Sequence, residues 1–422
     1  MIFRDKLTNG IRVVGETMEG YRSVSIGVWI GAGSVCEREG EHGASHFIEH
    51  MLFKGTEKRS AGDIAEEIDA LGGNLNAFTS KECTCFYVKV LNENTEKAME
   101  LLSDIICRSK LDGEDIEREK GVIIEEILMN DDSPEDLAHE TLCQEFYKGD
   151  PLALPVLGTE ESVSAFTRET LMNYKTRMYR PDNIVISAAG DFDFEELMVL
   201  CEKYFSIEST LPERKTKYGR QCGGRHAVFV EKDIEQTHIC MAFNGFPGDT
   251  DGQYPLYMLN NAVGGSISSR LFQSIREQKG MAYSVYSTPA FYDTTGYFTL
   301  YAGTNEKQAV DVTRLMLEEY KRIRDEGITE AENERSKNQM KTGYVLGRES
   351  TSAHSSSLGR AELFDRPFLS EDEIIRRIDA VTLEDIGNIL PTVCDFENMT
   401  AVFVGRVGEY KKEELRKMIE EA

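Results

Sequence analysis

Two histidines and a glutamate lie within one five-residue stretch, HFIEH at 46–50. On a helix, residues four positions apart share a face, so the imidazoles of His46 and His50 can bind one cation. Glu49 lies close enough to that face to take a proton from a water at an open coordination position. The spacing favours a metal site with an adjacent general base. The alternative is a pair of histidines on a solvated helix.

A third ligand has to come from elsewhere, because catalytic zinc sites usually carry three protein ligands and a water. Residues 115–130 have a helical pattern, and at about 100° per residue Glu119 and Glu126 fall within its apolar arc. The neighbouring Glu125 falls outside that arc. Burying carboxylates among isoleucines is unfavourable unless they are paired or bind a metal. The pattern therefore favours Glu126 and Glu119, with salt bridges to basic residues of the same helix as the alternative. The apolar residues of the arc are Ile116, Val122, Ile123, Ile124, Ile127 and Met129.

Three segments together resemble the family that includes mitochondrial processing peptidase, pitrilysin and insulin-degrading enzyme. They are HFIEHMLFKGT at 46–56, NAFTS at 76–80 and IEREKGVIIEEI at 116–127. The order H-x-x-E-H is the inverzincin signature of zinc peptidases. The resemblance extends through nearly the whole chain.

This resemblance implies one Zn²⁺ per chain, bound by His46, His50 and Glu126. It also implies that Glu49 is the general base. Glu119 matches a second acidic residue that supports the site, and we count it among the expected catalytic residues. The implied third ligand agrees with the separate argument from helical periodicity.

Two other segments are similar to the family's substrate-binding elements. Arg276 and Tyr283 match an arginine and tyrosine pair that holds the substrate and stabilises the oxyanion. A guanidinium can donate two parallel hydrogen bonds, and a phenol can donate to a developing oxyanion. Asn76, Ala77 and Phe78 match an edge strand to which an extended peptide adds through backbone hydrogen bonds. The alternatives are a surface arginine, a half-buried tyrosine and an ordinary hairpin strand.

Composition restricts the class of protein. The 422 residues, 40% of them hydrophobic, can form two domains of roughly 200 residues. A formal net charge of −26 argues against nucleic acid partners and is typical of solubility or of a preference for basic peptides. No apolar run reaches about 18 residues, so we expect no membrane span. Nine irregularly spaced cysteines and no recognisable signal segment predict free thiols and a cytoplasmic location.

The order of elements repeats along the chain, which indicates an internal duplication. Segments 24–30 and 238–243 both alternate like strands and lead into glycines, and H-x-x-E-H occurs only in the first half. We predict an α+β fold of two homologous lobes, each a largely antiparallel or mixed sheet flanked by helices. The predicted domains are a metal-binding catalytic domain (1–210), a linker (211–224) and a substrate-binding domain without metal ligands (225–422).

These features predict a zinc metalloendopeptidase that cleaves extended, unstructured peptides. Members of the resembled family enclose a chamber with four domains, and one such chain supplies two, so we predict a dimer. A homodimer is favoured because both the metal and the Arg/Tyr elements occur in one chain. A heterodimer with a metal-less relative is the competing arrangement. The alternative function is a non-catalytic assembly or scaffold subunit of a processing-peptidase-like complex, which the intact catalytic positions disfavour.

Overall fold

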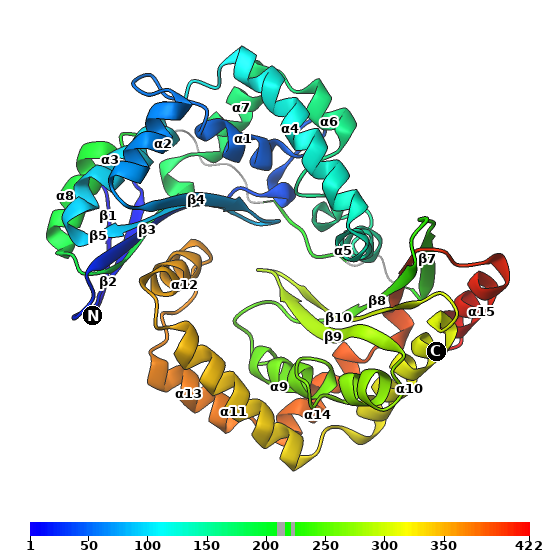
Figure 1. Ribbon diagram of the computed structural model, residues 1–422. Coiled ribbons are helices and arrows are strands. Elements are labelled where there is room, and N and C mark those ends of the chain that lie inside the picture. The colour runs from blue at the N-terminus through cyan, green and yellow to red at the C-terminus, as the bar shows by residue number, and fades with distance from the viewer. Residues whose placement is uncertain (209–215, 221–223) are drawn as a thin grey trace. The chain divides into compact units, whose positions relative to one another are not determined.

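Two β-sheets organise the computed structural model, which describes residues 1–208, 216–220 and 224–422 (Figure 1). Residues 211–215 and 221–223 of the predicted linker therefore lie outside the described residues. Each sheet belongs to one compact unit made of three chain segments. Unit 1 consists of Met1–Leu128, Leu154–Lys217 and Leu346–Phe368, and unit 2 of Met129–Ala153, Tyr218–Val345 and Leu369–Ala422. The predicted domains were contiguous in the sequence. Each unit instead includes one segment that the prediction assigned to the other domain.

The sheet of unit 1 has six strands in the order β1-β2-β6-β3-β5-β4. Only the β2–β6 pair is parallel among these neighbours. Its central strands are almost entirely buried, as expected for strands covered on both faces. The strands are β1 (Ile2–Lys6), β2 (Arg12–Thr17), β3 (Ser23–Ile30), β4 (Asn74–Thr79), β5 (Thr84–Leu91) and β6 (Ile184–Gly190).

Helices cover both faces of this sheet. Helices α1, α2, α3 and α8 contact one face, and α12 lies on the other (Figure 1). Alternate residues of β3, such as Ile26 and Val28, enter the large core beneath the first group, whereas Trp29 joins a smaller cluster beneath α12. The helices of unit 1 are α1 (Ala44–Leu52), α2 (Ala61–Ala70), α3 (Thr95–Arg108), α4 (Gly113–Asp132), α6 (Glu160–Ala165), α7 (Arg168–Met178), α8 (Phe194–Tyr204) and α12 (Thr351–Leu363). The last turn of α4 passes into unit 2.

Small and polar side chains fit α12 closely onto the sheet of unit 1. The Ser25 hydroxyl lies 2.8 Å from that of Thr351, and the Ser187 hydroxyl lies 3.0 Å from that of Ser355. A Cβ at Gly359 would lie 2.0 Å from the Trp29 indole nitrogen, so only glycine fits there. These contacts explain why this helix belongs to unit 1, although it is distant in the sequence.

Unit 2 contains a five-stranded sheet in the order β7-β11-β8-β10-β9. Numbered within each half, this order matches the β2-β6-β3-β5-β4 part of the first sheet, and the parallel pair β7–β11 corresponds to β2–β6. The shared topology supports an internal duplication, and the fold-class prediction is confirmed. The strands are β7 (His226–Val230), β8 (Gln236–Asn244), β9 (Ala282–Phe291), β10 (Gly296–Asn305) and β11 (Thr400–Val404).

Helix α5 packs against the sheet of unit 2, as α12 does in unit 1. His139 of α5 stacks on Tyr301, with ring centroids 5.4 Å apart, and its Nε2 lies 2.8 Å from the Tyr286 hydroxyl. The helices are α5 (Pro134–Phe146), α9 (Gln253–Val263), α10 (Ala309–Glu326), α11 (Glu330–Gly347), α13 (Glu371–Ala380), α14 (Leu383–Val393) and α15 (Glu409–Glu420), with a π-helix at Phe272–Glu277. Within the described part of the chain, every helix is too short or too polar to cross a bilayer.

Candidate active site

The short helix α1 presents the two histidines and Glu49. Its apolar residues are completely buried, and they fix the helix on the core of unit 1. The same packing leaves His46, Glu49 and His50 on a partly accessible face. The buried apolar residues are Phe47, Ile48, Met51 and Leu52. A rigid helix with one open face meets the requirement for holding ligands in fixed geometry.

A buried glutamate caps the N-terminus of this helix. The Glu37 carboxylate accepts hydrogen bonds from the backbone N–H groups of Gly43, at 2.7 Å, and Ser45, at 2.8 Å. Burial raises the pKa of Glu37 to about 8, although both hydrogen bonds oppose the shift. Carboxylates at helix N-termini are favoured by the free N–H groups and the helix dipole. Glu37 is not among the residues predicted from the sequence, because only the fold brings it to the start of α1.

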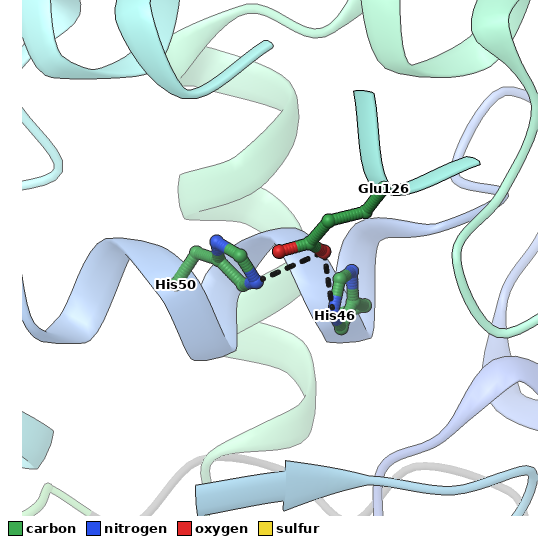
Figure 2. Close-up of side chains that lie close together, drawn as sticks. All are labelled: His46, His50 and Glu126. Carbon is green, nitrogen blue, oxygen red and sulfur yellow. Dashed lines mark ion pairs between the residues drawn. The ribbon is translucent and has the colours of Figure 1, made fainter. Parts of the chain in front are cut away.

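His46, His50 and Glu126 converge on one point (Figure 2). The Glu126 Oε2 atom lies 3.6 Å from His46 Nε2 and 3.5 Å from His50 Nε2. These distances exceed a normal N–H···O hydrogen bond of roughly 2.7–3.2 Å. They match the roughly 3.4 Å between ligands of a tetrahedral ion bonded at about 2.1 Å. The donor set therefore fits Zn²⁺, with one carboxylate oxygen and two imidazole nitrogens.

The protonation of His46 also suits metal binding. Burial, followed by the neighbouring charge of His50, lowers the pKa of His46 to about 3. The imidazole is therefore neutral near pH 7, which is the form that binds a metal. The Nε2 atom is the nitrogen that points toward Glu126, and the buried Nδ1 has no hydrogen-bond partner among the described residues.

Glu49 has a restrained carboxylate. The Thr79 hydroxyl donates a hydrogen bond to Glu49 Oε2 at 2.5 Å. Burial raises the pKa of Glu49, the Thr79 hydrogen bond lowers it, and the charge of Glu126 raises it. The net direction is upward, as required of a carboxylate that accepts a proton near neutral pH.

Glu119 is buried on α4 and is not one of the three converging residues. Ile116, Glu119 and Ile123 form its buried stripe, and the Glu119 carboxylate pairs with the Lys54 ammonium at 2.5 Å. Glu119 therefore pairs with a lysine outside its own helix, whereas the alternative expected from the sequence was a salt bridge within the helix. Val122 and Met129, which helical periodicity placed among the apolar residues of the arc, are both exposed. The helical periodicity predicted the direction in which each side chain of α4 points. It did not predict which turns of α4 are covered by the rest of the fold.

We expect Lys54→Met to destabilise the protein by about 1–3 kcal/mol, because the nearly fully buried Glu119 carboxylate would lose its counter-charge. Urea unfolding provides the measurement. The matched control is Lys120→Met, which breaks a pair with the exposed Glu117 and should change the free energy of unfolding by about 0.5 kcal/mol or less. Adding Glu119→Gln to the Lys54→Met variant should recover part of the lost free energy of unfolding. Equal effects of the two lysine variants would contradict this assignment.

The predicted substrate-binding residues of the first half lie on β4, an edge strand. Asn76 and Phe78 are exposed, and Ala77 is half-buried. The Ala77 backbone N–H donates a hydrogen bond to the Asn76 side-chain oxygen at 2.8 Å. The Phe78 ring packs edge-on against Trp29, with centroids 5.7 Å apart. The strand has an open edge suited to backbone pairing.

Arg276 and Tyr283 lie together in unit 2. The Arg276 guanidinium carbon lies 4.7 Å from the centre of the Phe272 ring and 5.0 Å from that of Tyr283. Tyr283 is 79% exposed and lies on β9, which is the edge strand of its sheet. By topology, β9 is the counterpart of β4. The two predicted substrate-binding segments therefore occupy equivalent places in the two units.

Comparisons with known proteins identify the family of this chain. The family model described as Insulinase (Peptidase family M16) matches residues 12–160, and the model described as Peptidase M16 inactive domain matches residues 165–340. A protein named an uncharacterized zinc protease of Bacillus subtilis is 41% identical over 390 residues, covering 92% of this chain and 95% of the relative. The chain belongs to peptidase family M16. The family resemblance predicted from sequence is confirmed.

Other similar proteins and solved structures extend the comparison. An uncharacterized zinc protease of Mycobacterium leprae is 38% identical, covering 92% of this chain and 88% of the relative. A protease from Helicobacter pylori has the same fold, with a TM-score of 0.90 at 21% identity and coverage of 96% and 99%. A Pseudomonas fluorescens structure described as a peptidase M16 inactive domain has a TM-score of 0.89 at 19% identity, covering 97% and 98%. Family membership and the relatives' names support a peptidase, and the names of the relatives imply zinc.

Proposed function

We propose that this M16 member is a zinc metalloendopeptidase that cleaves extended, unstructured peptides. The observation that carries the proposal is the convergence of His46, His50 and Glu126 at ligand distances, with Glu49 on the same helix face. One zinc per chain would occupy this point. When bound there, zinc polarises the scissile carbonyl and makes water more acidic.

Each protein group has a distinct proposed role. The Glu49 carboxylate accepts the proton of the attacking water and delivers it to the leaving amine. The open edge of β4, at Asn76, Ala77 and Phe78, pairs with the peptide backbone and so accepts many sequences. Backbone pairing requires an extended segment, which favours unstructured peptides over folded proteins.

Unit 2 would supply the remaining catalytic groups. In this proposal Tyr283 donates its phenolic proton to the oxyanion, and the Arg276 guanidinium holds Tyr283 and the peptide carbonyl. The exposure of Tyr283 and the stacking of Arg276 against its ring support these roles. Glu119 would act by fixing α4 through its pair with Lys54.

We also propose a peptide chamber formed by dimerisation. Homodimers are favoured over a pairing with a metal-less relative, because one chain carries both the ligand set and the Arg276–Tyr283 pair. The intact ligand set likewise disfavours a purely non-catalytic assembly subunit.

Metal removal tests the proposed activity. The purified protein should contain about one zinc per chain and should cleave an unstructured peptide at internal bonds, as measured by mass spectrometry. Dialysis against a chelator should reduce cleavage at least about 100-fold, and stoichiometric Zn²⁺ should restore it. A folded protein of the same mass should remain uncut. Cleavage that persists in zinc-free protein would refute the proposal.

A further inference from the structure

The last residue of β4 connects the edge strand to Glu49. Thr79 ends the strand, and its hydroxyl oxygen lies 2.5 Å from Glu49 Oε2 on helix α1. Its side chain is on the same face of the strand as the half-buried Ala77, which packs on the core of unit 1. A hydroxyl bound to a carboxylate forms a short, charge-assisted hydrogen bond. The strand and the helix are thus joined at the proposed base itself.

The arrangement around Thr79 directs its proton to Glu49. Thr84 lies opposite Thr79 in the β4–β5 ladder, and the two hydroxyl oxygens are 3.2 Å apart. The completely buried Thr84 hydroxyl donates to the backbone oxygen of Ala32 at 2.8 Å, so its own proton is already used. An ionised carboxylate only accepts hydrogen bonds. Thr79 therefore donates, and Glu49 accepts.

The second carboxylate oxygen of Glu49, Oε1, is available to accept a proton. A glutamate side chain has several rotatable bonds, and restraining it in advance avoids an entropy loss during the reaction. The hydrogen bond from Thr79 uses the Oε2 atom of Glu49. Among the described residues, no group donates a hydrogen bond to its Oε1 atom. Oε1 is thus the oxygen that can receive a proton from water.

We propose that Thr79 is a positioning residue that orients the Glu49 carboxylate and links it to the strand on which the peptide docks. This inference rests on the proposed function, because it assumes that Glu49 is the base and that β4 pairs with substrate. A peptide bound along Asn76–Phe78 ends its pairing beside Thr79, so any shift of the strand is transmitted to Glu49. Substrate docking and orientation of the base are therefore mechanically connected.

Two substitutions isolate the hydroxyl. Thr79→Val keeps the shape and β-branching but removes the donor, whereas Thr79→Ser keeps the donor. We expect Thr79→Val to reduce kcat about 10–100-fold with KM changed less than about 3-fold, and Thr79→Ser to stay within about 3-fold of wild type. The control Thr313→Val removes a buried hydroxyl that bonds the Ala309 backbone oxygen in α10, and it should leave kcat unchanged.

A double variant tests whether Thr79 acts through Glu49. In the Glu49→Gln background, adding Thr79→Val should cause little further loss of the residual cleavage, because the oriented base is already absent. Full additivity of the two losses would overturn the inference, as would a Thr79→Val enzyme as active as wild type. A Thr79→Ser enzyme as impaired as Thr79→Val would also overturn the inference, because loss of the hydroxyl would then not explain the loss of activity.

A crystallographic readout separates this inference from the proposed function. In metal-free crystals, the Glu49 carboxylate should be oriented in wild type and Thr79→Ser but displaced or spread over several rotamers in Thr79→Val. If wild type cleaves no peptide, the proposed function fails, and these crystals still decide the role of Thr79. An unchanged Glu49 carboxylate in Thr79→Val would overturn the inference on its own.

Discussion

Glu49→Gln should retain zinc but lose peptide cleavage by about 10²–10⁴-fold, the range typical of removing a general base. Glutamine has nearly the same shape, and its side-chain oxygen can still accept the Thr79 hydrogen bond. It cannot take a proton from water. His46, His50 and Glu126 are untouched, so zinc content measured by mass spectrometry should match wild type.

The matched control for this substitution is Glu66→Gln. Glu66 is exposed on α2, so the change removes the same charge without altering the site. Its cleavage rate should remain within about 2-fold of wild type, since exposed substitutions away from special features have small effects. If Glu49→Gln and wild type cleave alike, Glu49 is not the base. Loss of zinc from Glu49→Gln would instead assign it to the ligand set.

The sequence predicted local elements well, because their signals are local. Ser60 and Asp63 have the spacing of a capping box, and the structure contains that box at the start of α2. The edge strand expected at Asn76, Ala77 and Phe78 is β4, which pairs with β5. The glutamates of α4 show where local reasoning ends. Glu119 and Glu126 lie seven residues apart on one stripe, but only Glu119 is buried, because burial depends on what covers each turn.

Long-range contacts could not be predicted from the pattern. The partner of Glu119 is Lys54, 65 positions away, and the partner of Glu49 is Thr79 on another element. The exchange of α5 and α12 between the units was also missed. An amphipathic helix shows which face it buries, but its own sequence does not specify which sheet covers that face. Such pairings arise only from the tertiary arrangement.

Glu126→Gln should lower zinc affinity at least about 100-fold, which exceeds the 10–100-fold typical of outer-shell partners. The substitution replaces an anionic oxygen by a neutral amide at the point where both imidazole nitrogens converge. Two neutral histidines alone leave the ion short of a ligand and of a compensating charge. Zinc content after dialysis against a weak chelator, and cleavage of the same unstructured peptide, should fall together.

The neighbouring Glu125 supplies the matched control. It lies on the same helix with the same charge but is exposed and is not part of the group that converges with the histidines. Glu125→Gln should therefore retain its zinc and its activity within about 2-fold of wild type. Undiminished zinc in Glu126→Gln, together with loss in Glu125→Gln, would reverse the ligand assignment. Because the two variants differ by one position, about 100° around the helix, the comparison tests the direction of the ligand and not merely its charge.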